Sequence, residues 1–137
     1  MKQIFIDTNI FVYANDARDT EKQKKAISII TNLVKTQEGV VSTQVLQEYA
    51  YVAIAKLRQR AEIVLRQLKI LETFEVVNQS PELIRRAVEI MQTYKISFWD
   101  SCIISNAEQA NCSQIYSEDL NSGQYYSGVK IVNPFTA

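Results

Sequence analysis

The chain has 137 residues, of which 47% are hydrophobic and 22% are charged, values typical of one packed globular domain over residues 1–137. Fifteen lysines and arginines balance fifteen aspartates and glutamates, so no overall positive charge attracts nucleic acid. Histidine is absent, which excludes imidazole-based catalysis and the usual histidine-rich zinc sites. An enzyme of this composition must rely on carboxylates, hydroxyls, lysines or a hard metal ion.

In chain order, the apolar patterns predict a strand over 3–6, helices over 10–14 and 26–34, a strand over 40–42, two helices over 43–71 separated near 58–60, a strand over 74–77, helices over 81–91 and 97–110, and strands over 114–116 and 129–132. We expect Gly39 to close the second helix, Ser80 and Pro81 to begin the helix at 81, and Ser97 to cap the last one. Short strands rich in Val and Ile that alternate with helices predict an α/β fold with a mainly parallel sheet.

The two cysteines, Cys102 and Cys112, have no metal-ligand spacing and are too few for a disulfide framework, so we expect buried, reduced thiols. No segment approaches the roughly 18 apolar residues of a membrane span. The N-terminal apolar run ends at Asp7, too early for the core of a signal peptide. These features predict a cytoplasmic protein without membrane association.

Four carboxylates stand near the carboxyl ends of strands or the starts of helices, where an open α/β sheet binds ligands. Asp7 ends the first strand, Glu48 lies in the helix after the second, Asp100 lies in the first turn of its helix, and Asp119 follows the fourth strand along the chain. Each also has an ordinary interpretation: helix capping for Asp7 and Asp100, turn formation for Asp119, and a solvated helix edge for Glu48.

Taken together, the four acids favour a metal site. Carboxylates that converge at one edge of a sheet repel one another unless some become protonated or a cation binds. Oxygen ligands without His or Cys select Mg²⁺ or Mn²⁺ over zinc. Such an ion activates water and neutralises charge on a phosphoryl oxygen, so a metal-dependent hydrolase is indicated. These residues alone do not exclude a hydrolase other than a nuclease, such as a phosphatase.

The motifs resemble those of PIN-domain ribonucleases. They are IFIDTN at 4–9, VLQEY at 45–49, FWDS at 98–101, SEDL at 117–120 and NPF at 133–135. They span almost the whole chain, and the order and spacing of all four acids are similar to those of the VapC-like toxins of bacterial toxin–antitoxin systems. The resemblance implies a PIN-like three-layer α/β/α fold, with a short, mainly parallel central sheet flanked by helices.

The resemblance also implies roles for individual residues. Asp7, Glu48, Asp100 and Asp119 would be the catalytic, metal-binding acids that hold Mg²⁺ or Mn²⁺, with Asp7 and Asp100 as direct ligands. The small polar residues that orient them would be Asn9 and Ser117, with Thr8 as a secondary candidate, and Glu118 would be an extra acid. The implied activity is endonucleolytic hydrolysis of RNA by metal-activated water, which leaves a 5′-phosphate and a 3′-hydroxyl.

The implied partners are an RNA substrate such as tRNA or rRNA, a cognate antitoxin and a second copy of the chain in a homodimer. Basic side chains that stand as candidates for RNA contact are Lys22, Lys24, Lys25, Lys56, Arg58, Arg60, Arg66, Lys69, Arg85 and Arg86. Candidates for base stacking are Tyr13, Tyr125 and Tyr126, and candidates for an antitoxin groove are Val12, Tyr13 and residues 50–54. A housekeeping RNA-processing PIN nuclease and a non-catalytic PIN-like RNA-binding module remain as alternatives.

Overall fold

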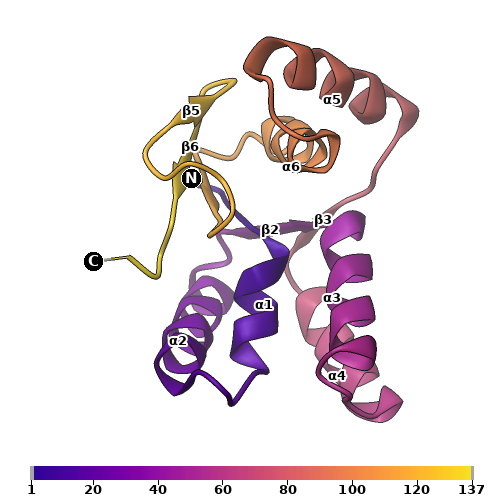
Figure 1. Ribbon diagram of the computed structural model, residues 1–137, viewed down its shortest axis with the longest axis vertical. Helices are drawn as coiled ribbons and strands as arrows, with labels where there is room; N and C mark the ends of the chain where they lie inside the picture. The colour runs from indigo at the N-terminus through magenta and orange to yellow at the C-terminus, as the bar shows by residue number, and fades with distance from the viewer. Residues whose placement is uncertain (1, 137) are drawn as a thin grey trace.

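The computed structural model describes residues 2–136 and places a six-stranded sheet between two layers of helices (Figure 1). The strands are β1 (Ile4–Ile6), β2 (Gly39–Ser42), β3 (Glu75–Val77), β4 (Gln114–Tyr116), β5 (Tyr125–Tyr126) and β6 (Val129–Val132). Their order across the sheet is β3-β2-β1-β4-β6-β5, and every neighbouring pair is parallel except β5 with β6. The predicted three-layer α/β/α architecture is therefore confirmed.

Helices cover both faces of the sheet (Figure 1). The first layer holds α1 (Thr8–Ala14), α2 (Thr20–Thr36), α3 (Thr43–Ala55) and α4 (Ala61–Leu71), and the second holds α5 (Pro81–Tyr94) and α6 (Phe98–Gln109). Ser80 and Ser97 cap α5 and α6 as predicted. Ser42 ends β2 and also caps α3 through the Val45 N–H, so no loop separates that strand from its helix. Within residues 2–136, no helix is long and apolar enough to cross a membrane.

Two expectations about local structure are wrong. Gly39 does not close α2: Gln37 does so in the left-handed conformation, with φ 60°, and its N–H donates to the Leu33 carbonyl. Gly39 instead begins β2. The patterns also miss β5, because two residues before the left-handed Ser127 and Gly128 are too short to show an alternation.

The core lies on both sides of the central strands. Phe5, Val40, Ile115 and Ile131 are fully buried, as expected for strands with helices on both faces. The two cysteines are buried and unpaired, as predicted. Gly39 is part of this packing, because the Phe74 ring occupies the space beside its Cα.

We predict that Gly39→Ala lowers the free energy of unfolding by about 1–3 kcal/mol through overpacking. The new Cβ would lie 2.5 Å from Cδ1 and 2.7 Å from Cε1 of Phe74. Urea unfolding measures the loss. In a Phe74→Leu background the ring is gone, so the cost of Gly39→Ala should shrink, whereas an equal cost in both backgrounds would contradict the steric explanation.

Candidate active site

The site begins where two adjacent parallel strands end. β1 pairs with β4 so that Ile6 lies opposite Tyr116, and the Asp7 N–H donates to the Tyr116 carbonyl at 3.0 Å. The next residue of each strand therefore lies at the same edge of the sheet. There the Ser117 hydroxyl donates to Oδ2 of Asp7 at 2.8 Å. Two residues that are 110 positions apart in the sequence thus share a hydrogen bond because of the strand register.

Asp7 is held on both of its carboxylate oxygens. Oδ1 accepts from the Thr8 N–H at 2.7 Å, so Asp7 caps α1, as its capping interpretation predicts. The side chain is almost fully buried, and this desolvation raises its pKa to about 6. The hydrogen bonds from Ser117 and Thr8 oppose the rise, while the charges of Asp119 and Glu48 add to it. Asp7 therefore carries its charge at neutral pH against a considerable electrostatic penalty.

Asp119 is linked to Asp7 through the same serine. Its backbone N–H donates to the Ser117 Oγ at 3.2 Å, so one hydroxyl accepts from Asp119 and donates to Asp7. Burial raises the pKa of Asp119, and the nearby charges of Asp100 and Glu118 raise it further, while the Asn9 side chain opposes the rise. The carboxylate thus lies among other acids in a partly dehydrated environment.

Glu48 and Asp100 approach from two different helices. Nε2 of Gln44, one turn before Glu48 on α3, donates to Oε1 of Glu48 at 2.9 Å and to the carbonyl of Trp99 at 3.4 Å. Gln44 thereby joins Glu48 to the turn that carries Asp100. The sequence analysis missed Gln44, although its spacing of four residues from Glu48 on a predicted helix was a usable signal.

The capping interpretation of Asp100 is only half satisfied. The Ser97 Oγ accepts from the Asp100 N–H at 3.1 Å, but within residues 2–136 no hydrogen bond returns from the Ser97 N–H to the Asp100 carboxylate.

The four candidate acids also have no basic partners. In the part of the chain that the structure describes, none of Asp7, Glu48, Asp100 and Asp119 forms an ion pair with a lysine or arginine.

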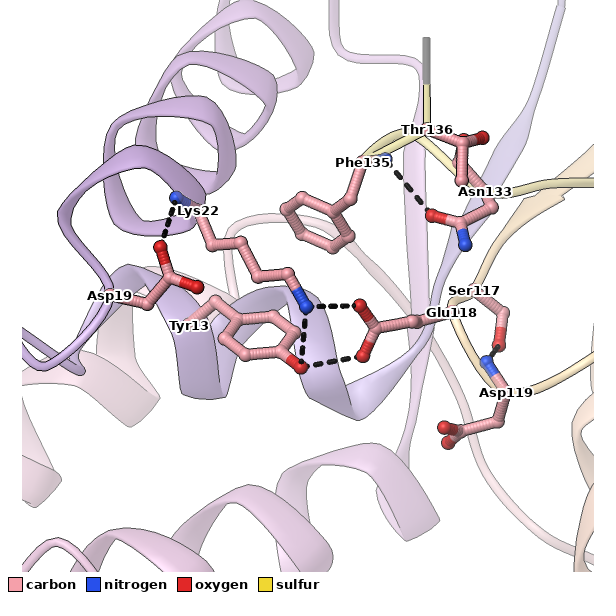
Figure 2. A network of polar contacts seen from close by, with 9 residues as sticks. All are labelled: Tyr13, Asp19, Lys22, Ser117, Glu118, Asp119, Asn133, Phe135 and Thr136. Atoms are coloured by element: carbon pink, nitrogen blue, oxygen red, sulfur yellow. Dashed lines mark hydrogen bonds and ion pairs between the residues drawn. The ribbon is translucent and has the colours of Figure 1, made fainter.

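Glu118 stands apart from these four acids. Its two carboxylate oxygens accept from the Tyr13 hydroxyl and from Nζ of Lys22, on the side away from Asp119 (Figure 2). Lys22 is therefore committed to an ion pair and is not a free cation for RNA. Neither contact was visible in the sequence, because the partners lie 105 and 96 residues away.

The donor set fits a hard cation. Among residues 2–136, no three Asp, Glu or Cys side chains are close enough to hold a metal ion by themselves. Buried polar atoms without protein partners lie among or beside the acids: Oγ1 of Thr8, both amide atoms of Asn9, and Oε1 of Gln44. Such atoms require water or a ligand. Acids and unpaired oxygens of this kind are the ligands that a hard, partly hydrated divalent cation accepts.

Comparison with known proteins identifies the family. The model of the PIN domain matches residues 4–125. The chain belongs to the PIN-domain family. The five motifs that carry the sequence resemblance begin at the start of this match, and all except NPF at 133–135 fall within it. A search of curated proteins gives no match for this PIN domain.

Solved structures show the same fold. The toxin VapC20 of Mycobacterium tuberculosis, described as cleaving the sarcin–ricin loop, is 19% identical with a TM-score of 0.70, over 93% of this chain and 99% of that one. A toxin–antitoxin complex from Klebsiella pneumoniae is 20% identical with a TM-score of 0.72, over 98% and 100%. VapBC2 of Rickettsia felis, bound to promoter DNA, is 21% identical with a TM-score of 0.68, over 93% and 96%. This PIN domain therefore has the fold of VapC toxins.

We predict a pH-dependent gain in stability for Asp7→Asn, measured by urea unfolding in chelator. The Asp7 carboxyl keeps its proton up to about pH 6 when folded but loses it near 3.8 when unfolded, so ionisation destabilises the fold across that interval. The advantage of Asp7→Asn over wild type should grow from pH 4 to 6 and then stay constant, at up to about 3 kcal/mol.

Asp16→Asn is the matched control with the opposite sign. Arg18 lowers the pKa of Asp16 to about 2, so its charge stabilises the fold above the unfolded pKa, and that stabilisation is lost only as the pH falls through 2. This variant should therefore be less stable than wild type at pH 7. A stability difference for Asp7→Asn that is constant from pH 4 to 7 would contradict the burial of an ionised Asp7.

Proposed function

We propose that this PIN domain is a metal-dependent endoribonuclease that acts as the toxin of a toxin–antitoxin pair. The observation that carries the proposal is the group of four acids whose charges raise the pKa values of Asp7 and Asp119, two acids that Ser117 joins at the ends of β1 and β4. Family membership supports nuclease chemistry, and the fold shared with a VapC toxin that cleaves an RNA loop supports RNA as the substrate. The absence of histidine supports metal-assisted rather than imidazole-assisted hydrolysis.

In the proposed site, Asp7 and Asp100 would hold the metal ion directly, and Glu48 and Asp119 would hold it directly or through water. A bound Mg²⁺ or Mn²⁺ ion supplies an activated water and neutralises charge on the phosphoryl oxygen. Ser117 and Thr8 orient Asp7, and Gln44 orients Glu48. A carboxylate of the same group would accept the proton of the attacking water. The leaving group is the 3′-oxygen, so the products carry a 5′-phosphate and a 3′-hydroxyl.

RNA contacts belong to exposed side chains around this edge. The Trp99 side chain, next to Asp100, is 66% exposed and is available to stack on unpaired bases. Tyr125 is exposed too, but it pairs with Lys130, which lies opposite Gln114 at the start of β4 and not at the end that carries Ser117. Tyr126 is buried and the Tyr13 hydroxyl is committed to Glu118, so neither supports the stacking expected of it. Arg86 is paired with Glu108, which leaves the exposed lysines of α2 as better candidates for phosphate contact than Arg86.

This chain has a partly apolar groove that suits the binding of an antitoxin segment. The groove lies between α1, α2 and α4 and is lined by Phe11, Ala14, Asn15, Ile27, Ile30, Thr31, Gln67, Ile70 and Leu71. Two of its apolar side chains, Ile27 and Ile70, are more than 40% exposed. None of the residues expected in sequence, Val12, Tyr13 and 50–54, lines it. We further propose a homodimer that acts in the cytoplasm, with exposed Ile84 and Val88 of α5 as the apolar contribution to self-association.

Cleavage of total cellular RNA by purified protein tests the function. Wild type should produce discrete fragments with Mg²⁺ or Mn²⁺ and none with chelator. The cleavage rate of Asp100→Asn should fall by more than about a hundredfold, because loss of a metal ligand costs more than loss of a residue that only orients one. Asp16→Asn, an acid outside the site that Arg18 neutralises, is the matched control and should retain activity.

One outcome would show a contaminated preparation, and another would contradict the proposal. Fragments that persist in chelator and with Asp100→Asn indicate a contaminating ribonuclease. Folded wild type, free of antitoxin, that cuts no RNA with either metal would favour the non-catalytic RNA-binding alternative. If discrete fragments do form, their ends identify the RNA and the cleavage position, which separates a toxin with one target from a housekeeping nuclease.

A further inference from the structure

A cluster of side chains next to the acidic site has a role that the proposed chemistry does not use. Glu118 accepts from the Tyr13 hydroxyl at 2.5 Å and from Nζ of Lys22 at 2.6 Å, so both of its oxygens are occupied. Nζ of Lys22 also lies 3.3 Å from the Tyr13 hydroxyl. The three residues come from α1, α2 and the turn after β4, and they form a closed triangle of polar contacts (Figure 2).

Aromatic rings enclose the lysine of this triangle. The Lys22 ammonium lies 4.6 Å from the centre of the Tyr13 ring and 5.7 Å from that of Phe135. The two rings meet edge to face, with centroids 5.1 Å apart. Only about a third of the Lys22 side chain and a quarter of the Glu118 side chain are exposed, so this ion pair is better shielded than the surface pair of Arg60 and Glu62. We call Tyr13, Lys22, Glu118 and Phe135 the clasp.

The clasp is anchored to the turn that carries the acids. Glu118 lies between Ser117, whose hydroxyl binds Asp7, and Asp119, whose N–H binds that hydroxyl. The side chains of Glu118 and Asp119 leave the backbone in different directions, one toward Lys22 and the other away from it (Figure 2). Holding Glu118 against α1 and α2 therefore fixes the backbone from which Asp119 projects.

We propose that Lys22, Tyr13 and Glu118 are positioning residues that hold the turn of residues 117–119 in the conformation in which Asp119 joins the acidic site. Glu118 is then a structural acid whose charge Lys22 neutralises, and not a fifth metal ligand. The inference rests on the proposed function, because it assigns Asp119 to the metal site. It adds that the position of Asp119 depends on Lys22, a cation on α2 that lies outside the site.

Charge substitutions in the clasp test this role by two measurements, neither of which is enzyme activity. The first is hydrogen exchange of the 117–119 amides in chelator, and the second is the affinity for Mn²⁺ by titration calorimetry. Lys22→Met and Glu118→Lys should each speed exchange of the Asp119 amide and weaken Mn²⁺ binding by about tenfold, the range found when residues that orient metal ligands are lost. The double variant Lys22→Glu with Glu118→Lys re-forms the pair and should recover most of both.

The controls separate positioning from simpler explanations. Lys35→Met removes a positive charge from the far end of α2 and should leave exchange and Mn²⁺ affinity unchanged. Lower thermal stability in the single variants without a change in exchange or Mn²⁺ affinity would overturn the inference in favour of a purely structural ion pair. A Lys22→Met variant that changes only the KM for RNA would also overturn it and would make Lys22 a phosphate contact.

Failure of the proposed function gives a different result. Wild type that binds no Mn²⁺ contradicts the metal site itself, whatever the clasp variants do. Wild type that binds Mn²⁺ with an affinity unchanged in every clasp variant contradicts this inference alone. Amide exchange does not require metal, so unchanged exchange in Lys22→Met rejects the clasp in either case.

Discussion

One hydroxyl group connects the fold to the candidate site. β1 and β4 are parallel neighbours in a register that places Asp7 beside Ser117, and the Ser117 hydroxyl then donates to Asp7 while it accepts from the Asp119 N–H. Two acids from distant parts of the chain are thereby held through one small side chain. A register shift of one residue would turn Asp7 and Ser117 to opposite faces of the sheet and separate them. The site therefore depends on the same pairing that buries the core.

The buried charges of Asp7 and Asp119 destabilise the fold locally, and the packing of the surrounding elements offsets this loss. Burial and neighbouring charge raise the pKa values of Asp7 and Asp119, which means that their ionised forms disfavour folding. The elements around them are well capped and closely packed. Ser42 joins β2 to α3 without a loop, Ser97 caps α6, and fully buried Phe5 and Ile115 flank the strand ends. Electrostatic strain of this kind, supported by a well-packed scaffold, is typical of functional sites.

Local patterns predicted the elements well, because caps and apolar spacing act over a few residues. Ser80 and Ser97 begin their helices where the sequence indicates, and Asp7 follows its strand. Gly39 misled the analysis, since helix closure and close packing both favour glycine and only the Phe74 ring distinguishes them. Gln44 was predictable from its spacing to Glu48. The partners of Glu118 were not, because an ion pair between residues 22 and 118 depends on how α2 packs beside the turn after β4.

The four acids of the candidate site are close enough to act on one another. The charges of Asp119 and Glu48 raise the pKa of Asp7, and that of Asp100 raises the pKa of Asp119. Within residues 2–136, none of the four has an arginine or lysine within 4 Å. In a chain with equal numbers of acidic and basic residues, this leaves unbalanced negative charge at one edge of the sheet. A polyanion such as RNA cannot approach that edge favourably until a cation is bound there. Under the proposed function, this charge imbalance would make RNA binding depend on a bound metal ion, and we propose that substrate and cofactor bind cooperatively.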